Sequence, residues 1–476
     1  WSQLAMDIVA SKYFRKAGVP GTGHETSVKQ VLHRIVHTLR TAGEERGGYF
    51  ASAADADTFE DELTYLMLNQ MGAFNSPVWF NCGLWHDYGI TGSGGNWTWS
   101  VDQEQPRLAT NAYENPQCSA CFILGVDDSL DSMLEAQRAE VTIFKHGSGS
   151  GWNASRIRGS GESLTGGGTS SGVMSFLKAY DSWAGSIKSG GTTRRAAKMV
   201  ILNMDHPDIV DFIEWKQKEE KKALALIREG YSADFNGEAY HTVSGQNSNN
   251  SVRIPDAFMN AYLESGKWKT HHCISGEVAN EYDASELMDK IADAAWTCAD
   301  PGVQFDDTIQ QWHTCKNTDR INATNPCSEY VFLDDSACNL ASINLVKFLR
   351  DDGSFDVEAY RQAVRVFITA MDIAVDFASY PTEKICRNSH DYRPLGLGYA
   401  NLGTMLMLLG IPYDSEEGRA WASALTGILC GHAYRTSAEI AASIGPFSGF
   451  KKNEKPMLDV IRMHRDAGHQ LDQQAC

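Results

Sequence analysis

A short segment late in the chain, Asn325-Pro326-Cys327-Ser328-Glu329, combines residue types that could do chemistry together. A residue that precedes proline avoids the helical region, so this segment is predicted to be extended. Alternate side chains of an extended chain share a face, which would place Asn325, Cys327 and Glu329 side by side. The thiol could serve as a nucleophile or a radical, the carboxylate as a base and the amide as a hydrogen-bonding anchor. A small buried cysteine beside a solvated glutamate would give the same pattern.

A second thiol could join this segment. Cys338 follows Cys327 by eleven residues, and Asp334-Asp335-Ser336 between them has turn chemistry. A fold-back at this turn would bring the two thiols together. A core cysteine is the alternative, because free cysteine is among the most buried residue types.

A Cys-x-x-Cys pair, Cys118 and Cys121, stands at the head of an apolar strand-like run. Such a pair suits a dithiol motif or half of a zinc site. Structural zinc usually needs a second pair at similar spacing, and the nearest candidate, His271-His272-Cys273, is a poor complement. The sequence therefore predicts no metal site and leaves open which of the two thiols would react.

The region from Lys145 to Lys198 is rich in glycine and serine and carries several cations. Residues 145–193 hold 12 glycines and 11 serines, and such backbone can turn its amides toward an anion. The cations of the wider stretch are Lys145, Arg156, Arg158, Lys188, Arg194, Arg195 and Lys198. A phosphate site is predicted here, with a flexible surface loop as the alternative. It is not a Walker loop, because Gly191 stands where the lysine must be.

The elements that must position these residues alternate along the chain. The first 71 residues read as helical, and apolar positions recur at spacings of three and four from Val28 to Leu39. Residues 89–100 read as a surface loop. Two apolar runs read as buried strands, at 120–126 and 199–204. Longer helical patterns follow at 130–144, 173–183, 287–298 and 364–377. Alternating strands and helices predict an α/β fold with a covered, largely parallel sheet.

Composition narrows the class of protein. The 476 residues include 60 acidic and 42 basic side chains, and a net charge of −18 argues against a protein that coats nucleic acid or an anionic membrane. No apolar run approaches the ~18 residues of a membrane span. Eleven cysteines, odd in number and widely spread, indicate a reduced, cytoplasmic protein. Because the chain opens on Trp1 within a helical pattern and stops at Cys476, we expect it to be a fragment.

Taken together, these segments resemble the catalytic subunit of ribonucleotide reductase, and most closely the adenosylcobalamin-dependent class II enzymes. The similarity covers nearly the whole chain and rests on six motifs in the family's order. They are Phe74-Asn75-Ser76-Pro77, Gln117-Cys118-Ser119-Ala120-Cys121-Phe122, Lys145 with the glycines after it, Gly190-Gly191 with Arg194-Arg195, Asn325-Pro326-Cys327-Ser328-Glu329, and Arg393-Pro394-Leu395-Gly396.

The resemblance implies a ten-stranded α/β barrel of two antiparallel halves, with the reactive cysteine on a finger loop around residue 327. It also implies an N-terminal, mainly helical region over residues 1–112 and a catalytic barrel over 113–476. The family's last barrel strands and its C-terminal cysteine pair are not found before Cys476. The barrel is therefore expected to be incomplete at its C-terminal end.

The resemblance also implies roles for individual residues. Cys327 would become the thiyl radical, Glu329 would accept the 3′-hydroxyl proton and Asn325 would hold the ribose. Cys121 and Cys338 would be the reducing dithiol, and Cys121 is preferred to Cys118. The substrate would touch Ser76, Ala120 and Gly149. A deoxynucleotide triphosphate effector would be read by Asp128, Ser129, Lys145 and Arg158, and the loop containing Gly190, Gly191, Arg194 and Arg195 would relay its identity.

As a whole, the resemblance implies an enzyme that makes 2′-deoxyribonucleotides from ribonucleoside di- or triphosphates, with adenosylcobalamin as radical source. A thioredoxin- or glutaredoxin-type reductant and a homodimer would complete it. Two rival interpretations stay open. A class I large subunit would use a separate radical-generating subunit, and a non-catalytic nucleotide-binding regulator could share the barrel. The full thiol set with Glu329 argues against the regulator, which has no use for it.

Overall fold

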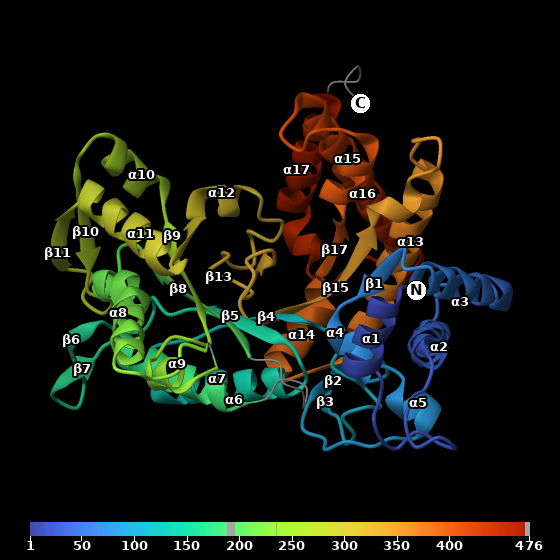
Figure 1. Ribbon diagram of the computed structural model, residues 1–476, viewed down its shortest axis with the longest axis horizontal. Helices are drawn as coiled ribbons and strands as arrows, with labels where there is room; N and C mark the ends of the chain where they lie inside the picture. The colour runs from blue at the N-terminus through green and yellow to red at the C-terminus, as the bar shows by residue number, and fades with distance from the viewer. Residues whose placement is uncertain (188–195, 235, 472–476) are drawn as a thin grey trace. The chain divides into compact units, whose positions relative to one another are not determined.

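The computed structural model describes residues 1–187, 196–234 and 236–471 (Figure 1). The chain forms two compact units, which we call unit 1 (Trp1–Ala120 and Ala337–Cys476) and unit 2 (Cys121–Ser336). These boundaries differ from the predicted division at residue 112, which concerns family domains and stays a prediction. Among the described residues, no helix is both long and apolar enough to cross a membrane.

Unit 2 is built on parallel strands in the order β4, β5, β8, β9 and β12. Their bounds are Cys121–Leu124, Gly149–Asn153, Ala197–Asn203, Asn249–Ile254 and Gly302–Phe305. The strands read as apolar runs because parallel strands are buried on both faces, and Phe122, Trp152 and Ile201 are almost fully buried. The predicted α/β fold with a largely parallel sheet is thus confirmed for this unit.

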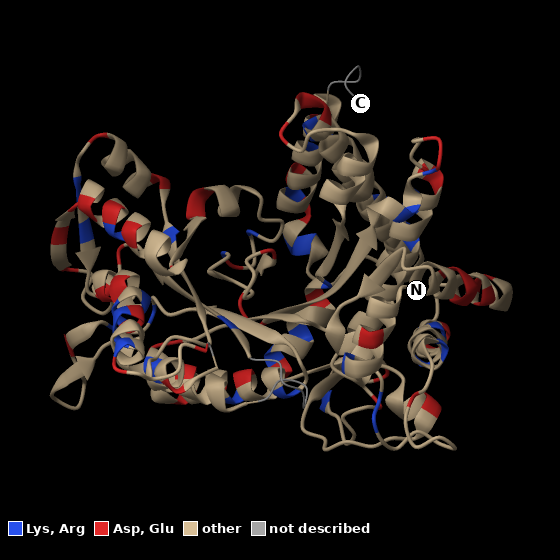
Figure 2. Ribbon diagram, viewed as in Figure 1, with Lys and Arg blue, Asp and Glu red and all other residues tan. Residues whose placement is uncertain are grey.

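Helices connect the strands of unit 2 and supply most of its outer layer (Figure 1). They are α6 (Leu130–Lys145), α7 (Val173–Ser186), α8 (Ile209–Arg228), α9 (Glu238–Thr242), α10 (Asp256–Leu263), α11 (Ala284–Cys298) and α12 (Asp306–Gln311). Three hairpins complete the unit: β6 (Ser160–Ser163) with β7 (Thr169–Ser171), β10 (Lys267–His271) with β11 (Val278–Asp283), and β13 (Ala323–Thr324) with β14 (Val331–Phe332). Acidic and basic residues are interspersed along α8 (Figure 2).

Unit 1 combines helices with two small groups of strands. The helices are α1 (Gln3–Lys12), α2 (Val28–Arg46), α3 (Ala53–Leu68), α4 (Ser76–Asn81), α5 (Leu84–Tyr88), α13 (Val357–Phe377), α14 (Glu383–Tyr392), α15 (Leu402–Leu409), α16 (Glu416–Ile444) and α17 (Phe450–His469), with a 3₁₀ turn at Leu345–Phe348. Strand β15 (Ser336–Asn344) pairs antiparallel with β1 (Gly72–Phe74) and parallel with β17 (Leu395–Ala400).

The predicted amphipathic helix at Val28–Leu39 is confirmed as α2. It begins at Ser27, whose side chain caps the first turn, while Gln30 reaches back to the Ser27 backbone in a capping box. Its apolar face, including Val31 and Ile35, is fully buried.

The predicted loop at residues 89–100 is wrong in its last four positions. Trp97–Ser100 forms β2, which pairs antiparallel with β3 (Gln105–Leu108) and with β16 (Ser379–Tyr380). The glycines and asparagines before it marked a loop correctly, but the Trp-Thr-Trp run has strand propensity.

Candidate active site

The segment from Asn325 to Glu329 contains a tight turn, and the predicted extended conformation is wrong at residues 325–328. The Ser328 amide donates to the Asn325 carbonyl at 3.1 Å, which closes a β-turn between strands β13 and β14. Pro326 occupies the second position of the turn, where its fixed φ is favourable. The backbone of Ser328 then has a left-handed φ of 69°. Cys327 is exposed at the tip of this turn.

Asn325 and Glu329, on either side of the turn, both contact Cys121 at the start of β4. The Asn325 Nδ2 group donates to the Cys121 Sγ atom at 2.9 Å, and that sulfur lies 3.4 Å from Glu329 Oε1. The amide orientation is fixed independently, because Asn325 Oδ1 accepts from the Tyr330 backbone at 3.0 Å. Of the five predicted catalytic residues, the structure therefore brings Cys121, Asn325 and Glu329 into contact. Cys327 is exposed on the turn between Asn325 and Glu329.

The strand β5 lies against this turn because two of its residues are glycines. A Cβ atom at Gly149 would stand 2.7 Å from the Pro326 ring, and one at Gly151 would stand 1.8 Å from the Thr324 carbonyl oxygen. Any side chain there would push the turn away. Gly149, predicted to touch substrate, is thus required for packing the turn as well.

Cys118 has surroundings unlike those of Cys121, although only two residues separate them. It is fully buried in unit 1, where a hydrogen bond with Cys82 and then burial raise the pKa of its thiol well above the ordinary value. Such a thiol is a poor nucleophile. Its surroundings support the preference for Cys121.

The remaining predicted thiol, Cys338, lies in unit 1 on β15 and is 2% exposed. Gly396 on the paired strand β17 leaves it room, because a Cβ atom there would come within 3.1 Å of the Cys338 sulfur. This explains the glycine of the Arg393-Pro394-Leu395-Gly396 motif. Of the other predicted substrate residues, Ser76 begins α4 and its hydroxyl lies 3.1 Å from that of Tyr13, and Ala120 ends the first segment of unit 1.

The predicted effector residues separate into two places in unit 2. Ser129 caps α6, accepting from the Ser132 amide at 3.1 Å. The Arg158 Nε group donates to Asp128 at 2.6 Å, beside that cap. Lys145 ends the same 16-residue helix, roughly 24 Å away at 1.5 Å per residue. Arg158 therefore lies with Asp128, at the opposite end of α6 from Lys145, and the four predicted effector residues do not form one group.

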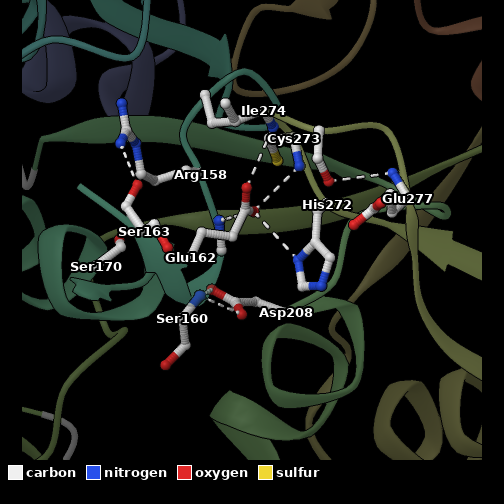
Figure 3. A network of polar contacts seen from close by, with 12 residues as sticks. Arg158, Ser160, Glu162, Ser163, Ser170, Asp208, His272, Cys273, Ile274 and Glu277 are labelled. Carbon is white, nitrogen blue, oxygen red and sulfur yellow. Dashed lines mark hydrogen bonds and ion pairs between the residues drawn. The ribbon is translucent and has the colours of Figure 1, made fainter. Parts of the chain in front are cut away.

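The backbone that carries Arg158 is fixed by a buried carboxylate (Figure 3). Glu162 accepts from three backbone amides, those of Gly159 at 2.7 Å and of Cys273 and Ile274 at 3.1 Å each. Burial would raise the pKa of Glu162, but these amides lower it overall. The Arg158 Nη1 group also donates to the Ser163 carbonyl at 2.9 Å. The arginine is consequently held in place on a rigid loop.

Lys198 and the residues 188–195 complete the predicted phosphate region. Lys198 does not face an anion site, because it is buried and pairs with Glu140 at 2.8 Å. Lys188 and the specificity-loop residues Gly190, Gly191, Arg194 and Arg195 lie outside the described residues.

The predicted residues lie neither in a metal site nor in the cavity found in unit 1. Within the described ranges, no group of three His, Cys, Asp or Glu side chains is placed to hold a metal ion. Cys273 instead lies 3.5 Å from the Ile157 carbonyl. A cavity of about 580 Å³ in unit 1 is lined by His33, His37, Thr38, Thr41, His86, Asp87 and Tyr88.

Sequence reasoning missed two polar residues beside the turn. Gln304 on β12 and Asn249 on β9 both donate to the segment 324–328. A local signal for Gln304 was present in the sequence, because it is a polar residue in an otherwise apolar strand. In the structure its side chain is buried, at 6% exposed.

Comparison with known proteins gives a consistent result. Residues 119–472 match the family described as "Ribonucleotide reductase, barrel domain", and residues 1–70 match "Class II vitamin B12-dependent ribonucleotide reductase". The chain is 52% identical over 475 residues to the vitamin B12-dependent ribonucleotide reductase of Rhodopirellula baltica, and 51% identical over 471 residues to that of Streptomyces coelicolor. These alignments cover 99% and 98% of this chain and 46% of each relative.

A more distant relative is the vitamin B12-dependent ribonucleoside-diphosphate reductase of Mycobacterium tuberculosis, 34% identical over 346 residues. That alignment covers 72% of this chain and 46% of the relative. The chain thus spans about half the length of the curated relatives it matches.

Proposed function

This chain belongs to the ribonucleotide reductase family, with the class II vitamin B12-dependent enzymes as its relatives, and we propose that it reduces ribonucleotides by thiyl-radical chemistry. The products would be 2′-deoxyribonucleotides, and adenosylcobalamin would be the radical source. One observation supports the proposal above others. Cys121 lies between Asn325 and Glu329, at 2.9 and 3.4 Å, next to the turn that exposes Cys327. A nucleotide-binding regulator has no need of this cluster.

In the proposed reaction each residue has a separate chemical role. The Cys327 radical takes the hydrogen atom from the 3′ carbon of the ribose, and Glu329 accepts the proton of the 3′-hydroxyl. The 2′-hydroxyl then leaves as water with a proton from the dithiol of Cys121 and Cys338. The two thiols become a disulfide, and their two electrons with the second thiol proton form the new C–H bond at the 2′ carbon. Glu329 then returns its proton to the 3′ oxygen, and Cys327 returns its hydrogen atom to the 3′ carbon. Asn325 orients both the ribose and the Cys121 sulfur.

The proposed cofactor fits the exposure of Cys327. When bound, adenosylcobalamin supplies the one-electron oxidation that converts the Cys327 thiol to its radical. The thiol must be reachable by a large group, and Cys327 is exposed at the tip of its turn while Cys121 and Cys338 are buried. This cofactor brings its own cobalt, so no protein-built metal centre is required. A class I enzyme would instead depend on a second subunit.

The rest of the proposal concerns assembly and regulation. The ten-stranded barrel, its missing last strands, the thioredoxin- or glutaredoxin-type reductant and the cytoplasmic setting are inferred from the family. A homodimer is supported by α6 and α7, which pack together yet leave Leu130, Leu134 and Trp183 exposed. The same helix begins at Asp128 and Ser129, where the deoxynucleotide triphosphate effector is proposed to bind. The name of the Mycobacterium relative favours diphosphate substrates.

The decisive experiment is single-residue replacement with a matched control. The chain is incubated with a ribonucleoside diphosphate, adenosylcobalamin and a dithiol, and deoxyribonucleotide is measured by mass spectrometry. Cys327→Ser should abolish product, because a hydroxyl cannot carry the radical. Cys298→Ser should retain it, because the Cys298 thiol donates to the carbonyls of Ala294 and Asp300, as a serine hydroxyl can.

Product from Cys327→Ser at the wild-type rate would refute the role of Cys327. Wild-type chain that forms no product with the cofactor present would refute the proposed activity for this chain. Product without cobalamin would refute adenosylcobalamin as the radical source.

A further inference from the structure

The Cys327 turn cannot hold its own shape. The two strands that flank it, β13 and β14, have only two residues each, and an isolated hairpin is marginal in water even when it is longer. Ser328 also has a left-handed φ of 69°, which is unfavourable for a residue with a side chain. Something outside the hairpin must therefore stabilise the turn.

Two side chains from the parallel sheet of unit 2 reach the turn and do this. Gln304 on β12 donates through Nε2 to the Thr324 hydroxyl at 3.1 Å and to the Ser328 hydroxyl at 3.4 Å. It thus bridges the residues that enter and leave the turn. Asn249 on β9 donates to the Pro326 carbonyl at 2.8 Å. Together the two side chains hold Thr324 and Pro326 before Cys327 and Ser328 after it.

Burial of the Gln304 side chain destabilises the folded state. The residue is 6% exposed, and its Oε1 atom is buried without a hydrogen-bond partner among the described residues. An unsatisfied buried acceptor is destabilising, so an apolar residue would suit this strand position better for stability alone. The bridging donor is the only use that the contacts show for an amide here.

We propose that Gln304 is a positioning residue for the reaction, acting on Cys327 through Thr324 and Ser328. It holds Ser328 in its left-handed conformation and thereby fixes where the Cys327 sulfur stands relative to the Cys121, Asn325 and Glu329 cluster. Asn249 is the second anchor of the same turn. The part of the inference that concerns catalysis rests on the proposed function.

The test compares Gln304→Met with Gln310→Met in the full chain. Methionine keeps the length of glutamine and removes its hydrogen bonds. Gln310 is a matched control because its amide also anchors this part of the chain, donating to the Ile321 carbonyl at 2.7 Å, but does not contact the turn. Backbone hydrogen exchange of residues 325–330 is measured by mass spectrometry, because the Ser328 and Tyr330 amides report the turn directly.

We expect exchange in residues 325–330 to become about fivefold faster in Gln304→Met, the change that loss of one net hydrogen bond gives. Gln310→Met should change it less than about twofold. Turnover of a ribonucleotide should show a kcat about tenfold to a hundredfold lower with an unchanged KM, because a small misplacement of the thiol affects the reaction and not the binding.

Unchanged exchange in Gln304→Met would overturn the inference, and so would an increase spread evenly over unit 2 or matched by Gln310→Met. If Gln304→Met does not fold, Ser328→Ala removes the acceptor from an exposed position and should give the same local increase. The exchange measurements need no turnover. An inactive wild-type chain would therefore refute the proposed function, while the exchange result would still decide the positioning of the turn.

Discussion

The Cys327 turn in unit 2 and the Arg393 cluster in unit 1 are both polar, yet they are built in opposite ways. Around Cys327 most of the described contacts are between neutral groups: amides donate to hydroxyls, to a carbonyl and to a sulfur, and Glu329 is the one carboxylate among them. Around Arg393 the contacts are charged and buried. Its guanidinium donates to Asp372 and to Asp376 at 2.8 Å each, and His390 contacts Asp376 at 2.7 Å.

The two regions also differ in exposure. Cys327, Ser328 and Glu329 are exposed, whereas Arg393 and its two aspartates have at most 12% of their side chains exposed. Burial would raise the pKa of Asp376, but Arg393 and His390 lower it overall. Polar reactive residues can therefore stand on the exposed turn at a small cost in the free energy of unfolding. The buried Arg393 cluster instead stabilises the fold next to β17 and β15, the strand of Cys338.

The largest expected effect is on the dithiol. Cys121→Ser should abolish multiple turnover, because serine cannot supply electrons to the leaving 2′-hydroxyl. Cys118→Ser is the matched control, and it should keep multiple turnover because Cys118 lies with Cys82 in unit 1. Product formed per enzyme over many cycles measures both variants. If Cys118→Ser is the inactive one, the reducing role moves to Cys118.

Next in size is the proposed base. Glu329→Gln should lower kcat by about 10²- to 10⁴-fold, because the amide cannot accept the 3′-hydroxyl proton. The free energy of unfolding should stay within about 0.5 kcal/mol of wild type, because Glu329 is an exposed side chain. Steady-state kinetics and urea denaturation check the two halves. A large loss of stability would contradict the small cost in stability that the comparison assigns to chemistry at the turn.

The Arg393 cluster should give the reverse outcome. Arg393→Met leaves two buried aspartates without their main partner and should lower the free energy of unfolding by about 3–5 kcal/mol. Arg387→Met, on the helix α14 that ends just before Arg393, breaks an exposed pair with Glu383, so it should cost less than about 1 kcal/mol. Urea denaturation followed by fluorescence compares them. Equal midpoints for the two variants would contradict the structural role of Arg393.

A smaller effect is expected at the effector residues. Arg158→Glu places a carboxylate beside Asp128 and should weaken binding of a deoxynucleotide triphosphate about tenfold, with basal turnover retained. Arg228→Glu, an exposed position at the end of α8, provides the control for net charge. Equilibrium binding to the three proteins is the measurement. Equal affinities would show that the effector binds elsewhere.

The smallest effect concerns pH. Burial raises the pKa of Asp334 to about 7, although Arg156 and Asn322 act in the opposite direction. An aspartate in the unfolded chain titrates near 4, so between about pH 4 and 7 the folded state binds more protons. The free energy of unfolding therefore falls as the pH rises through this window. The effect is opposite in sign to that of Asp376, whose contribution is lost as the pH falls below about 4.

Asp334→Asn removes the titration at this position. Its stability relative to wild type should increase by about 1 kcal/mol or more between pH 4.5 and 7.5. Urea denaturation across this range measures the difference. Parallel pH profiles for the two proteins would contradict the raised pKa.

The sequence could predict the elements well because their signals are local. Residues 130–144, 173–183 and 364–377 were predicted as helices and are observed as parts of α6, α7 and α13. Their apolar positions recur with helical spacing over three or more turns, and Ser129 caps α6 as its residue type favours. The parallel sheet followed from alternation of strands and helices.

The site was less predictable, and the reason is distance along the chain. The prediction that Asn325, Cys327 and Glu329 share a face relied on an extended backbone, but Pro326 closes a turn there instead. The partner of Asn325 and Glu329 lies more than 200 residues away, at Cys121. Likewise, Arg158 and Lys198 were read as free cations because Asp128 and Glu140 are not their neighbours in sequence.

By itself the sequence determined the α/β class and the family and supplied the candidate thiols, since each depends on residue type, short-range spacing or motif order. Only the tertiary structure decided which side chains meet: Cys121 with Asn325 and Glu329, Cys118 with Cys82, and Gln304 with the Cys327 turn. Each of these contacts joins strands or turns that are remote along the chain. Burial of apolar surface, which has no direction, brings the elements together, and the partners of a polar group are then set by what packing places within its reach.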